Sequence, residues 1–571
     1  MPQTTRRAFL AASASAPGLL RAAPARPNVV LLITDDQGYG DLSLHGNPHL
    51  ATPHLDRIAR EGVRFTQFQV TPVCSPTRAG LLTGRYHYRT GVVDTYLGRS
   101  MMYPDEVTLA ELLREDGYRT GLFGKWHLGD NYPLRAIDQG FETALCHKGG
   151  GISQPSDPPG NSYFDPVLDD NGRPVRMKGY CTDIFFNRAI EFIEANRDRP
   201  FLAWIATNAP HTPLEVAEEL VAPFRARGLD ETTARIYGMV RNIDDNVGRL
   251  LDHLKRLDLE QNTLVVFLTD NGPQQRRYNA GLRGLKGSVY QGGIKVPLFL
   301  RWPRAFEAGK TVEALASYID VMPTLLEACG VRPPKGLQLD GRSLLGLAAG
   351  RQMVWPERTL FVQWHRGDAP EPFRNAAVRT SRYKLVDGKE LYDLNKDPGE
   401  EHDIAAAQPR MVAALRAAYE RWFQDVSSTR GYAPPRIYLG TEHENPVTLT
   451  RQDWRGPRAS WAPDGLGYWE VDVRRAGRYE IRLRMAPAPA DGVARFRLNN
   501  VAVEAPVKKG AEECLFPAVE LQAGPGRAEP VLIFGDTELG VHYLDVRRLQ
   551  AGLSAPVGSP ASRRGSPGGR R

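Results

Sequence analysis

Residues 74–85 bring a nucleophilic side chain, a proline and a cation into one short run, Cys-Ser-Pro-Thr-Arg-Ala-Gly-Leu-Leu-Thr-Gly-Arg. Pro76 stands two places and Arg78 four places after Cys74, and the small, Leu-rich residues that follow predict the start of a helix. A lone cysteine in such a place is most often a buried, unreactive side chain. A helix N-terminus at this place would also favour a bound anion.

The full run resembles the signature of the type I sulfatases, in which this cysteine is oxidised after translation to Cα-formylglycine. In that family the aldehyde is hydrated to a gem-diol, and one hydroxyl attacks sulfur and expels the alcohol. Deprotonation of the second hydroxyl restores the aldehyde and releases sulfate. A serine could attack but would lack that second hydroxyl. The resemblance therefore implies covalent catalysis at residue 74 and a formylglycine-generating enzyme as a partner.

Four short apolar runs predict strands that are buried on both faces of a sheet. Each leads into polar residues: 28–34 into Asp35 and Asp36, 118–124 into Lys125, Trp126 and His127, 201–207 into Asn208 to His211, and 263–269 into Asp270 and Asn271. Any one of these ends could be an ordinary turn or a helix cap. Ligands bind at the carboxyl ends of strands in open α/β sheets, so four such ends together indicate one active site.

Two helices are expected between these strands, over about 182–196 with Thr182 as its cap and over about 232–257. Alternating strands and helices indicate an α/β fold with a mostly parallel central sheet and helices on both faces.

The sulfatase resemblance implies a metal site at the strand ends. Asp35, Asp36, Asp270 and Asn271 match the family's calcium ligands, with the formylglycine at position 74 also facing the metal. Hard oxygen ligands without an imidazole suit Ca²⁺, and Mg²⁺ less well.

The same resemblance implies roles for the cationic and imidazole side chains. Arg78 and Lys125 match residues that stabilise the formylglycine oxygens and the sulfate, and His127 matches the group that deprotonates the second hydroxyl. His211 and Lys286 match residues that bind sulfate and assist the departing alcohol. A histidine suits proton transfer because its unperturbed pKa is about 6.5.

Several other residues have weaker claims on a site. His45, His49 and His54 cluster early in the chain, and a solvated polar loop explains them better than a metal site does. His87 could equally line the pocket or lie on the surface. Trp126 and Tyr290 could shape the pocket, although aromatic residues are more often part of a core.

Composition places the chain among ordinary globular proteins. It has 571 residues, 42% of them hydrophobic and 24% charged, which predicts two or three domains. The net charge of +7 owes much to arginines at both ends, and no nucleic-acid-binding motif is present. Five cysteines do not make a disulfide framework, although Cys146 and Cys181 flank one loop and could pair.

The first residues resemble a twin-arginine export signal. Thr-Arg-Arg-Ala-Phe-Leu at 5–10 precedes a mildly apolar stretch and an Ala-Pro-Ala site at 23–25, so 1–25 is expected to be a cleaved leader. The alternative is a disordered basic N-terminus. The twin-arginine export machinery would deliver a folded bacterial protein to the periplasm or the medium. No other stretch is apolar enough to predict a transmembrane helix.

The chain divides into segments of different character. We expect the catalytic α/β domain over 26–340, a small antiparallel sheet plus helix over 341–426, a linker over 427–446, a β-sandwich over 447–550 and a disordered tail over 551–571. Within the second segment, 377–385 predicts one alternating strand. The sandwich resembles carbohydrate-binding jelly rolls, and a packing module without a ligand is at least as good an interpretation.

These observations predict an exported, calcium-dependent sulfatase, with a sulfated carbohydrate as the first choice of substrate and an aryl sulfate as the simpler one. A phosphonate or phosphate ester hydrolase of the alkaline phosphatase superfamily is the alternative enzyme. A glycan-binding protein with an inactive catalytic domain is the alternative from another class. The identity of the sugar, its regiochemistry, exo or endo action and the oligomeric state are left open.

Overall fold

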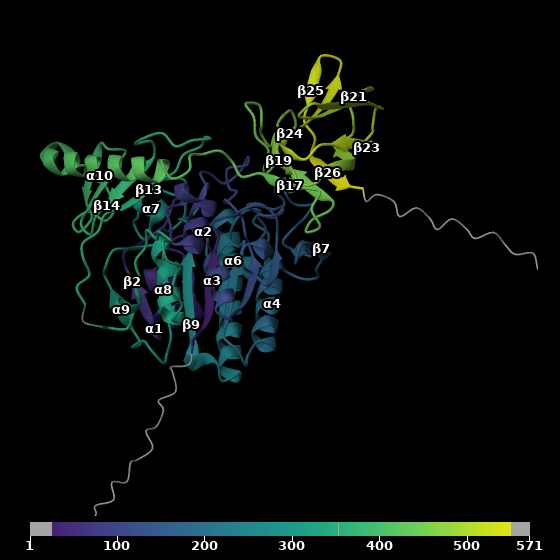
Figure 1. The fold of residues 1–571 in the computed structure, drawn as a ribbon. Coiled ribbons are helices and arrows are strands. Elements are labelled where there is room, and N and C mark those ends of the chain that lie inside the picture. The colour runs from purple at the N-terminus through teal and green to yellow at the C-terminus, as the bar shows by residue number, and fades with distance from the viewer. Residues whose placement is uncertain (1–25, 352, 550–571) are drawn as a thin grey trace, which may run out of the picture.

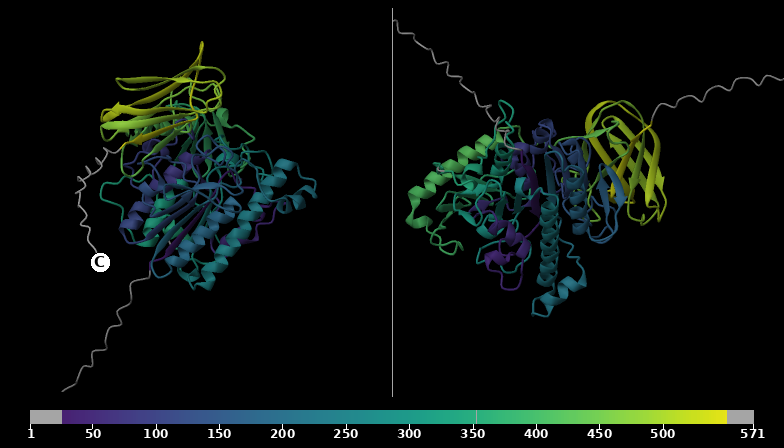
Figure 2. Two further views of the ribbon diagram at one scale, coloured as in Figure 1. Left: turned by 90° about the vertical axis from the view of Figure 1, so that its right-hand side faces the viewer. Right: turned by 90° about the horizontal axis from the view of Figure 1, so that it is seen from below.

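The computed structural model describes residues 26–351 and 353–549. The expected leader over 1–25 and the tail over 551–571 lie outside the described residues. Figures 1 and 2 show a central α/β region with two smaller sheet regions on opposite sides of it, one with helix α10 and one formed by the C-terminal strands. In the described part of the chain, no helix combines the length and the apolar character needed to cross a membrane.

The central sheet confirms the predicted mostly parallel architecture. Its ten strands within the described residues have the order β11-β2-β10-β9-β1-β8-β4-β5-β6-β7, and the five from β9 to β5 run parallel. The strands are β1 Asn28–Thr34, β2 Val63–Phe65, β4 Arg119–Gly124, β5 Thr143–Cys146, β6 Val167–Asp170, β7 Arg173–Arg176, β8 Phe201–Ala206, β9 Thr263–Thr269, β10 Leu298–Arg301 and β11 Lys310–Val312. The four strands predicted to carry the site begin and end within one residue of their expected bounds.

Helices cover both faces of this sheet, because consecutive strand residues point to opposite sides. Val29, Leu31 and Ile33 of β1 pack in one hydrophobic cluster with α2 and α8, whereas Val30 and Leu32 pack in a second cluster with α4 and α6. The helices are α1 Pro53–Arg60, α2 Cys74–Thr83, α3 Leu109–Glu115, α4 Cys181–Ala195, α5 Glu218–Arg225, α6 Glu231–Arg256, α7 Gln291–Ile294, α8 Val321–Cys329 and α9 Leu345–Ala348.

The two predicted helices are found as α4 and α6. Asp230 caps α6 by accepting a hydrogen bond from the Thr233 N–H, which fixes where the helix begins. The expected cap of α4 was placed two residues too late: Thr182 is its second helical residue, and Tyr180 is the N-cap.

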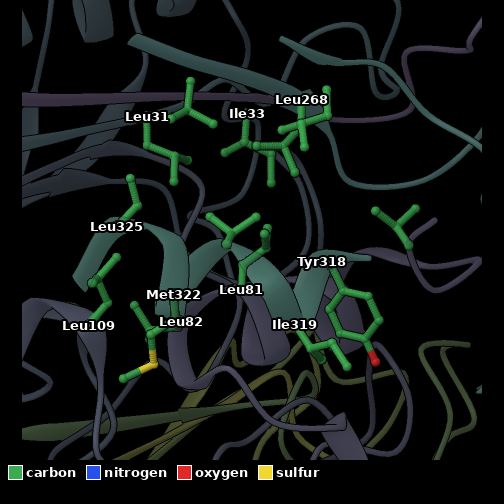
Figure 3. Close-up of a cluster of buried hydrophobic side chains, with 14 of the residues drawn as sticks. Leu31, Ile33, Leu81, Leu82, Leu109, Leu268, Tyr318, Ile319, Met322 and Leu325 are labelled. Carbon is green, nitrogen blue, oxygen red and sulfur yellow. The ribbon is translucent and has the colours of Figure 1, made fainter. Parts of the chain in front are cut away.

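Helix α2 is buried over its whole length, which is unusual for a helix that carries a reactive group. Figure 3 shows Leu81 and Leu82 against Tyr318 and Met322, beside the inward side chains of the central strands. A Cβ on Gly80 would lie 2.1 Å from Cε2 of Tyr318, so only glycine allows this approach. Gly80 of the 74–85 run therefore has a packing reason of its own.

The second region is a four-stranded antiparallel sheet backed by α10. Its elements are β13 Leu360–Gln363, β14 Ala376–Arg379, β15 Tyr383–Val386, β16 Glu390–Asp393 and α10 Pro409–Ser427. The single strand predicted over 377–385 is wrong, because β14 and β15 form a hairpin there. The hydroxyl of Thr380 accepts the Tyr383 N–H and turns the chain between the two strands.

The C-terminal region is a two-sheet β module, defined here as residues 437–549. One sheet has the order β17-β19-β24-β21-β22 with β25 on β24, and the other β18-β26-β20-β23. The strands are β17 Ile437–Leu439, β18 Val447–Thr450, β19 Trp469–Val473, β20 Gly477–Arg484, β21 Gly492–Leu498, β22 Val501–Val507, β23 Glu513–Leu521, β24 Gly524–Phe534, β25 Thr537–Leu539 and β26 Tyr543–Arg548. The expected linker over 427–446 thus contains β17, which pairs with β19 of the module.

Short elements complete the described chain. A two-stranded sheet joins β3 Phe68–Gln69 to β12 Ala316–Ser317. The 3-10 helices are η1 Ser43–His45, η2 His87–Thr90, η3 Ala136–Asp138, η4 Glu260–Asn262, η5 Tyr318–Asp320 and η6 Ala405–Ala407.

Candidate active site

The carboxyl ends of β1, β4, β8 and β9 meet, and their polar residues are in contact. Lys125 Nζ lies 2.6 Å from Asp35 Oδ2, and the Asp36 N–H donates to Asp270 Oδ1 at 3.3 Å. His211 Nε2 lies 3.8 Å from Asp36 Oδ2. The four strand ends therefore form one cluster, as their shared position on the sheet requires.

Two of the predicted site residues have backbone conformations that residues other than glycine rarely adopt. Asp36 has a φ of 63° and His127 a φ of 62°, both in the left-handed region. Each follows the end of its strand by two or three residues, where the chain must turn sharply to aim the side chain back across the sheet edge. Such strain is commonly retained at functional sites.

Cys74 is the first residue of α2 and is 3% exposed. Its sulfur and carboxylate oxygens of Asp35 and Asp270 all lie within 4.8 Å of one another. Burial raises the pKa of the Cys74 thiol, against the opposing effect of Lys125 and Lys286. An unmodified thiol here is therefore mostly protonated near neutral pH and is a weak nucleophile.

Arg78 lies one helical turn after Cys74 and is also buried. Its Nε and Nη2 both donate to Asp270 Oδ2, at 3.1 and 2.8 Å, and its Nη1 donates to the Lys125 carbonyl at 3.0 Å. The guanidinium is thereby held rigidly between two strand ends and α2.

Lys286 reaches the cluster from a loop. Its Nζ lies 2.6 Å from Asp36 Oδ1, which also accepts a hydrogen bond from Asn271 Nδ2 at 2.7 Å. Burial alone would lower the pKa of Lys286, but Asp36, Cys74 and Asp35, in that order of effect, together outweigh burial and raise the pKa. The pKa of Asp36 is lowered in return by Lys286 and His211, although burial opposes this. The surrounding loop bends through positive φ at Gly284 and Gly287.

The oxygen atoms at the centre of the cluster fit a bound cation. Asp35 Oδ1, Asp36 Oδ2 and Asn271 Oδ1 are buried and accept no hydrogen bond from any residue that the structure describes. Burial, with the nearby Asp35 carboxylate next in effect, raises the pKa of Asp270 to about 6. Buried oxygens without a partner are costly, and hard oxygens of this kind suit Ca²⁺ or Mg²⁺. Asp35, Asp36, Asp270 and Asn271 would hold such an ion.

The charges of the cluster leave room for both a metal and an anion. Three carboxylates (Asp35, Asp36 and Asp270) face three cations (Arg78, Lys125 and Lys286) in ion pairs of 2.6 to 2.8 Å. A divalent ion would make the site positive, and an anionic substrate would then be attracted to it.

The two histidines each have one ring nitrogen fixed by a carbonyl. His127 Nε2 lies 2.7 Å from the Thr95 carbonyl, and His211 Nδ1 lies 2.6 Å from the Thr212 carbonyl. A carbonyl accepts but cannot donate, so those nitrogens carry the proton. In the neutral rings, His127 Nδ1 and His211 Nε2 are then the basic atoms. Burial, and Lys125 or Lys286 after it, lowers the pKa of both, that of His211 to about 3.

These groups open into a pocket of about 460 Å³. The residues that line it are Val73, Cys74, Thr95, Tyr96, His127, Gly150, Gln154, His211, Thr212, Gln274, Lys286, Gly287, Trp364, Arg366 and Trp461. A Cβ at Gly150 would lie 2.6 Å from the His127 ring, so the glycine lets this loop approach the base. The pocket thus presents a potential nucleophile, two bases and a cation to a ligand.

Comparisons with known proteins agree with this arrangement. The model of the sulfatase family matches residues 27–331, and that of the C-terminal part of N-sulphoglucosamine sulphohydrolase matches residues 285–423. This chain belongs to the sulfatase family. It is therefore a sulfuric ester hydrolase by family, within the alkaline phosphatase superfamily, as the 74–85 run predicted.

Three similar proteins illustrate the range of this sulfatase's relatives. N-acetylgalactosamine-6-sulfatase of Canis lupus familiaris is 34% identical over 62% of this chain and 71% of its own length. Arylsulfatase A of Homo sapiens is 33% identical over 71% of this chain and 88% of its own. The crystal structure of Ps i-CgsB in complex with k-i-k-neocarrahexaose is 28% identical over 71% of this chain and 95% of that one, with a TM-score of 0.65.

The structure brings all of the predicted site residues to this one place, and their individual roles stay predictions. The weaker candidates lie elsewhere. His87 is buried, with both ring nitrogens facing the carbonyls of Val92 and Gln363, so it is neither a surface nor a pocket residue. Trp126 and Tyr290 are structural: the Trp126 Nε1–H donates to the Leu134 carbonyl, and the Tyr290 hydroxyl donates to Glu390.

The early histidines and the cysteines have other surroundings in the sulfatase. His45 stacks on Tyr39 at 3.8 Å, and its loop is half-buried rather than fully solvated. His54 lies near Asp244 and Asp245, away from the strand ends. Cys146 and Cys181 are both free thiols in the structure, so the open question of their pairing is answered against a disulfide.

Sequence reasoning missed the outer wall of the pocket. Thr95, Tyr96, Trp364, Arg366 and Trp461 come from three segments that are far apart in the chain. None belongs to a motif, and aromatic residues of this kind are common in cores. Only the fold brings them together.

Proposed function

We propose that this sulfatase is an exported enzyme that hydrolyses sulfate monoesters of a carbohydrate, with a formylglycine made from Cys74 and a bound Ca²⁺. One observation carries the proposal: buried oxygens of Asp35, Asp36 and Asn271 accept no hydrogen bond from any described residue, and a carboxylate oxygen of Asp35 lies within 4.8 Å of the sulfur of Cys74 at the N-terminus of α2. A cation site, a nucleophile position and an anion-favouring helix end coincide there.

The chain's own residues have distinct tasks in this scheme. Formylglycine would supply a hydrated aldehyde whose second hydroxyl permits sulfate release, and a Ca²⁺ held by Asp35, Asp36, Asp270 and Asn271 would supply positive charge that attracts an anionic substrate. Arg78 and Lys125 orient and neutralise the anionic group from the side of the sheet. Lys286 does so from the loop, where it is the cation of the cluster that lines the open pocket.

The two histidines are the proposed proton-transfer groups, because each has one ring nitrogen that is not fixed by a backbone carbonyl. His127 Nδ1 faces no donor or acceptor among the described residues, and the opposite nitrogen is fixed on Thr95, so Nδ1 can take the proton whose loss releases sulfate. His211 Nε2 lies 3.8 Å from Asp36 Oδ2, and it can give a proton to the departing alcohol after it has taken one up from solvent, which the negative charge of the bound substrate favours. The lowered pKa values keep both rings neutral before substrate binds.

A sulfated carbohydrate is the preferred substrate class. Among the relatives, one is named for a sulfated amino sugar and one similar structure holds a neocarrahexaose. The pocket of about 460 Å³ is polar at its base and aromatic at its outer wall, which suits a sugar with a charged substituent.

Export through the twin-arginine route is part of the proposal, on the strength of residues 5–10. It places the mature enzyme in the bacterial periplasm or the medium. It also lets a formylglycine-generating enzyme act on Cys74 before the folded protein leaves the cytoplasm.

The first experiment is mass spectrometry of the peptide containing Cys74, on protein from its natural host. A mass lower by about 18 Da than the cysteine form marks the aldehyde that covalent catalysis requires. An intact thiol together with no hydrolysis would contradict the proposal and favour a glycan-binding protein.

The second experiment compares 4-nitrophenyl sulfate with a matched aryl phosphonate, with and without EGTA. We expect faster hydrolysis of the sulfate, loss of activity on chelation and recovery with Ca²⁺. A faster phosphonate reaction would instead favour the phosphonate ester hydrolase.

A further inference from the structure

The wall of the active-site pocket opposite the strand ends comes partly from the C-terminal β module. Trp461 of that module lines the pocket together with Tyr96 of the catalytic region and with Trp364 and Arg366 of the second sheet region. The catalytic nucleophile position, Cys74, lines the same pocket. The module is therefore a component of the active site in this structure.

The aromatic side chains of this wall are packed against one another. The Tyr96 and Trp461 rings meet edge to face, with centroids 5.2 Å apart. The Arg366 guanidinium lies 4.3 Å from the Tyr96 centroid and 5.2 Å from that of Trp364. Aromatic faces beside a polar group, partly exposed in a pocket, are suited to an amphipathic ligand such as a sugar ring.

A second cavity adjoins the pocket, and Cys74 is not among the residues that line it. It has a volume of about 270 Å³ and shares Gln154 and Trp461 with the first. Its other lining residues come from the loop over 153–160 of the catalytic region and from the module. The module residues include Arg451, His542 and Tyr543. Trp461 and Gln154 thus stand at the border of the two neighbouring cavities, and the second one lies between the loop and the module.

Several contacts hold the module in this place. Gln452 Nε2 donates to the Thr95 carbonyl at 3.0 Å, and the Tyr543 hydroxyl donates to the Asp157 carbonyl at 2.7 Å. Arg455 pairs with Asp368 at 2.8 Å.

Hydrophobic side chains also join the module to the catalytic region. Leu97, Met101 and Leu134 of the catalytic region belong to the hydrophobic core of the module. The wall is therefore built into the fold and is not carried on a freely moving domain.

We propose that Trp461 and Tyr96 form a sugar-binding subsite beside the sulfate site, and that the second cavity takes the next sugar of the same chain. The substrate class is then a sulfated oligosaccharide and not a small sulfate ester. This inference rests on the proposed function. Binding energy from the neighbouring sugars would position the sulfate group against residue 74, so larger substrates should react faster.

The test uses the full-length, formylglycine-bearing protein and a series of substrates. The series is 4-nitrophenyl sulfate, a sulfated monosaccharide, and the disaccharide and tetrasaccharide that end in it, from chondroitin sulfate and from carrageenan. Trp461→Ala is compared with Tyr468→Ala, a half-buried aromatic residue of the module outside both cavities. Trp461→Phe tests rescue by an aromatic ring.

The expected result depends on substrate size. Trp461→Ala should lower kcat/KM for the tetrasaccharide by about 30-fold, as for a tryptophan at the centre of a binding surface. It should change the rate on 4-nitrophenyl sulfate by about 3-fold or less, while Trp461→Phe recovers part of the loss and Tyr468→Ala behaves as wild type. An equal loss on every substrate, or no loss on any, would overturn the subsite.

Binding separates this inference from the proposed function. In a Cys74→Ala background, isothermal titration should find tighter binding of the tetrasaccharide than of the monosaccharide, and Trp461→Ala should remove the difference. If the wild type hydrolyses no sulfate ester but this binding difference is present, the proposed function fails and the subsite stands. If hydrolysis occurs and the binding difference is absent, the subsite fails alone.

Discussion

The two sides of the pocket are built in different ways. On the inner side, Asp35 and Asp270 follow directly on strand ends, and Lys125 does the same, so the central sheet alone fixes their positions. On the outer side, Tyr96 and Trp461 come from loops of different sheets and meet only after the β module has docked. The comparison teaches that the proposed chemistry of this sulfatase uses residues at the ends of single strands, whereas the proposed sugar subsite needs the catalytic region and the β module together.

Replacing the nucleophile tests the inner side and should have the largest effect. Cys74→Ala should lower kcat by about 10⁴-fold or more on every substrate, since loss of a covalent nucleophile typically costs that much. Steady-state rates on 4-nitrophenyl sulfate and on a sulfated oligosaccharide measure it. Cys514→Ala, a free cysteine of the module, is the control and should be active. Substantial activity in Cys74→Ala would show that residue 74 is not the nucleophile.

Replacing the proposed general base, His127, should have the next largest effect on kcat. His127→Ala should reduce kcat by about 10² to 10⁴-fold, the usual contribution of a positioned general base, irrespective of substrate length. A burst of alcohol without matching sulfate release is the more specific sign, because the proposed step is the second half of the reaction. His49→Ala serves as the control. Loss on long substrates only would place His127 in substrate binding instead.

Gln452 tests the comparison between the two sides of the pocket, because it belongs to the β module but contacts the loop that holds His127 on the inner side. It shares the Thr95 carbonyl with His127 Nε2, so Gln452→Ala should loosen the base and lower kcat by about 10-fold on all substrates. Water reaching His127 should also raise its pKa toward the ordinary value and move the acidic limb of the pH–rate profile upward. An unchanged profile with a lower unfolding temperature would mean that Gln452 is only structural.

The last expected effect is on stability instead of activity, and it arises where the loop over 153–160 and the β module meet. Burial raises the pKa of Asp157 from 3.8 to about 7, although the amides of Asn161 and Ser153 oppose it. Because the folded pKa is the higher one, this contribution to stability is complete below about pH 4 and is lost as the pH rises through 7.

Denaturant unfolding at different pH values measures this contribution. Between pH 5 and 7 the free energy of unfolding should fall by about 2 kcal/mol, at about 1.4 kcal/mol per pH unit for one proton. Asp157→Asn should remove that part of the slope, while Asp165→Asn, a change at an exposed acid nearby in the sequence, should leave it. Equal slopes in wild type and Asp157→Asn would contradict the assignment.

The inner side could be predicted from the sequence because each part of it is local. Asn28–Thr34 is a near-continuous apolar run, and Asp35 and Asp36 stand at its end, so strand and site are recognised together. The resemblance of the 74–85 run to a known signature then supplied the roles. The fold class was predictable for the same reason, since β and α segments alternate with clear periodicity.

The outer side and some boundaries could not be predicted. The sequence around Trp461 contains no motif that marks a binding site. Its contact with Tyr96 forms only when the β module packs against the catalytic region. The hairpin at Thr380 was missed because three turn residues sit inside an otherwise alternating pattern. The linker was predicted to include the residues of β17. This three-residue strand pairs with β19, which lies about thirty residues later in the chain, so no local pattern reveals it.

The shared core of module and catalytic region has a consequence for cooperativity. Leu97, Met101 and Leu134 complete the apolar interior of the β module, so that interior opens to water if the loops that carry them unfold. The module and these loops should therefore melt in a single transition. By mass action, any ligand that binds at the sulfate site would protect the distant β strands from hydrogen exchange as well.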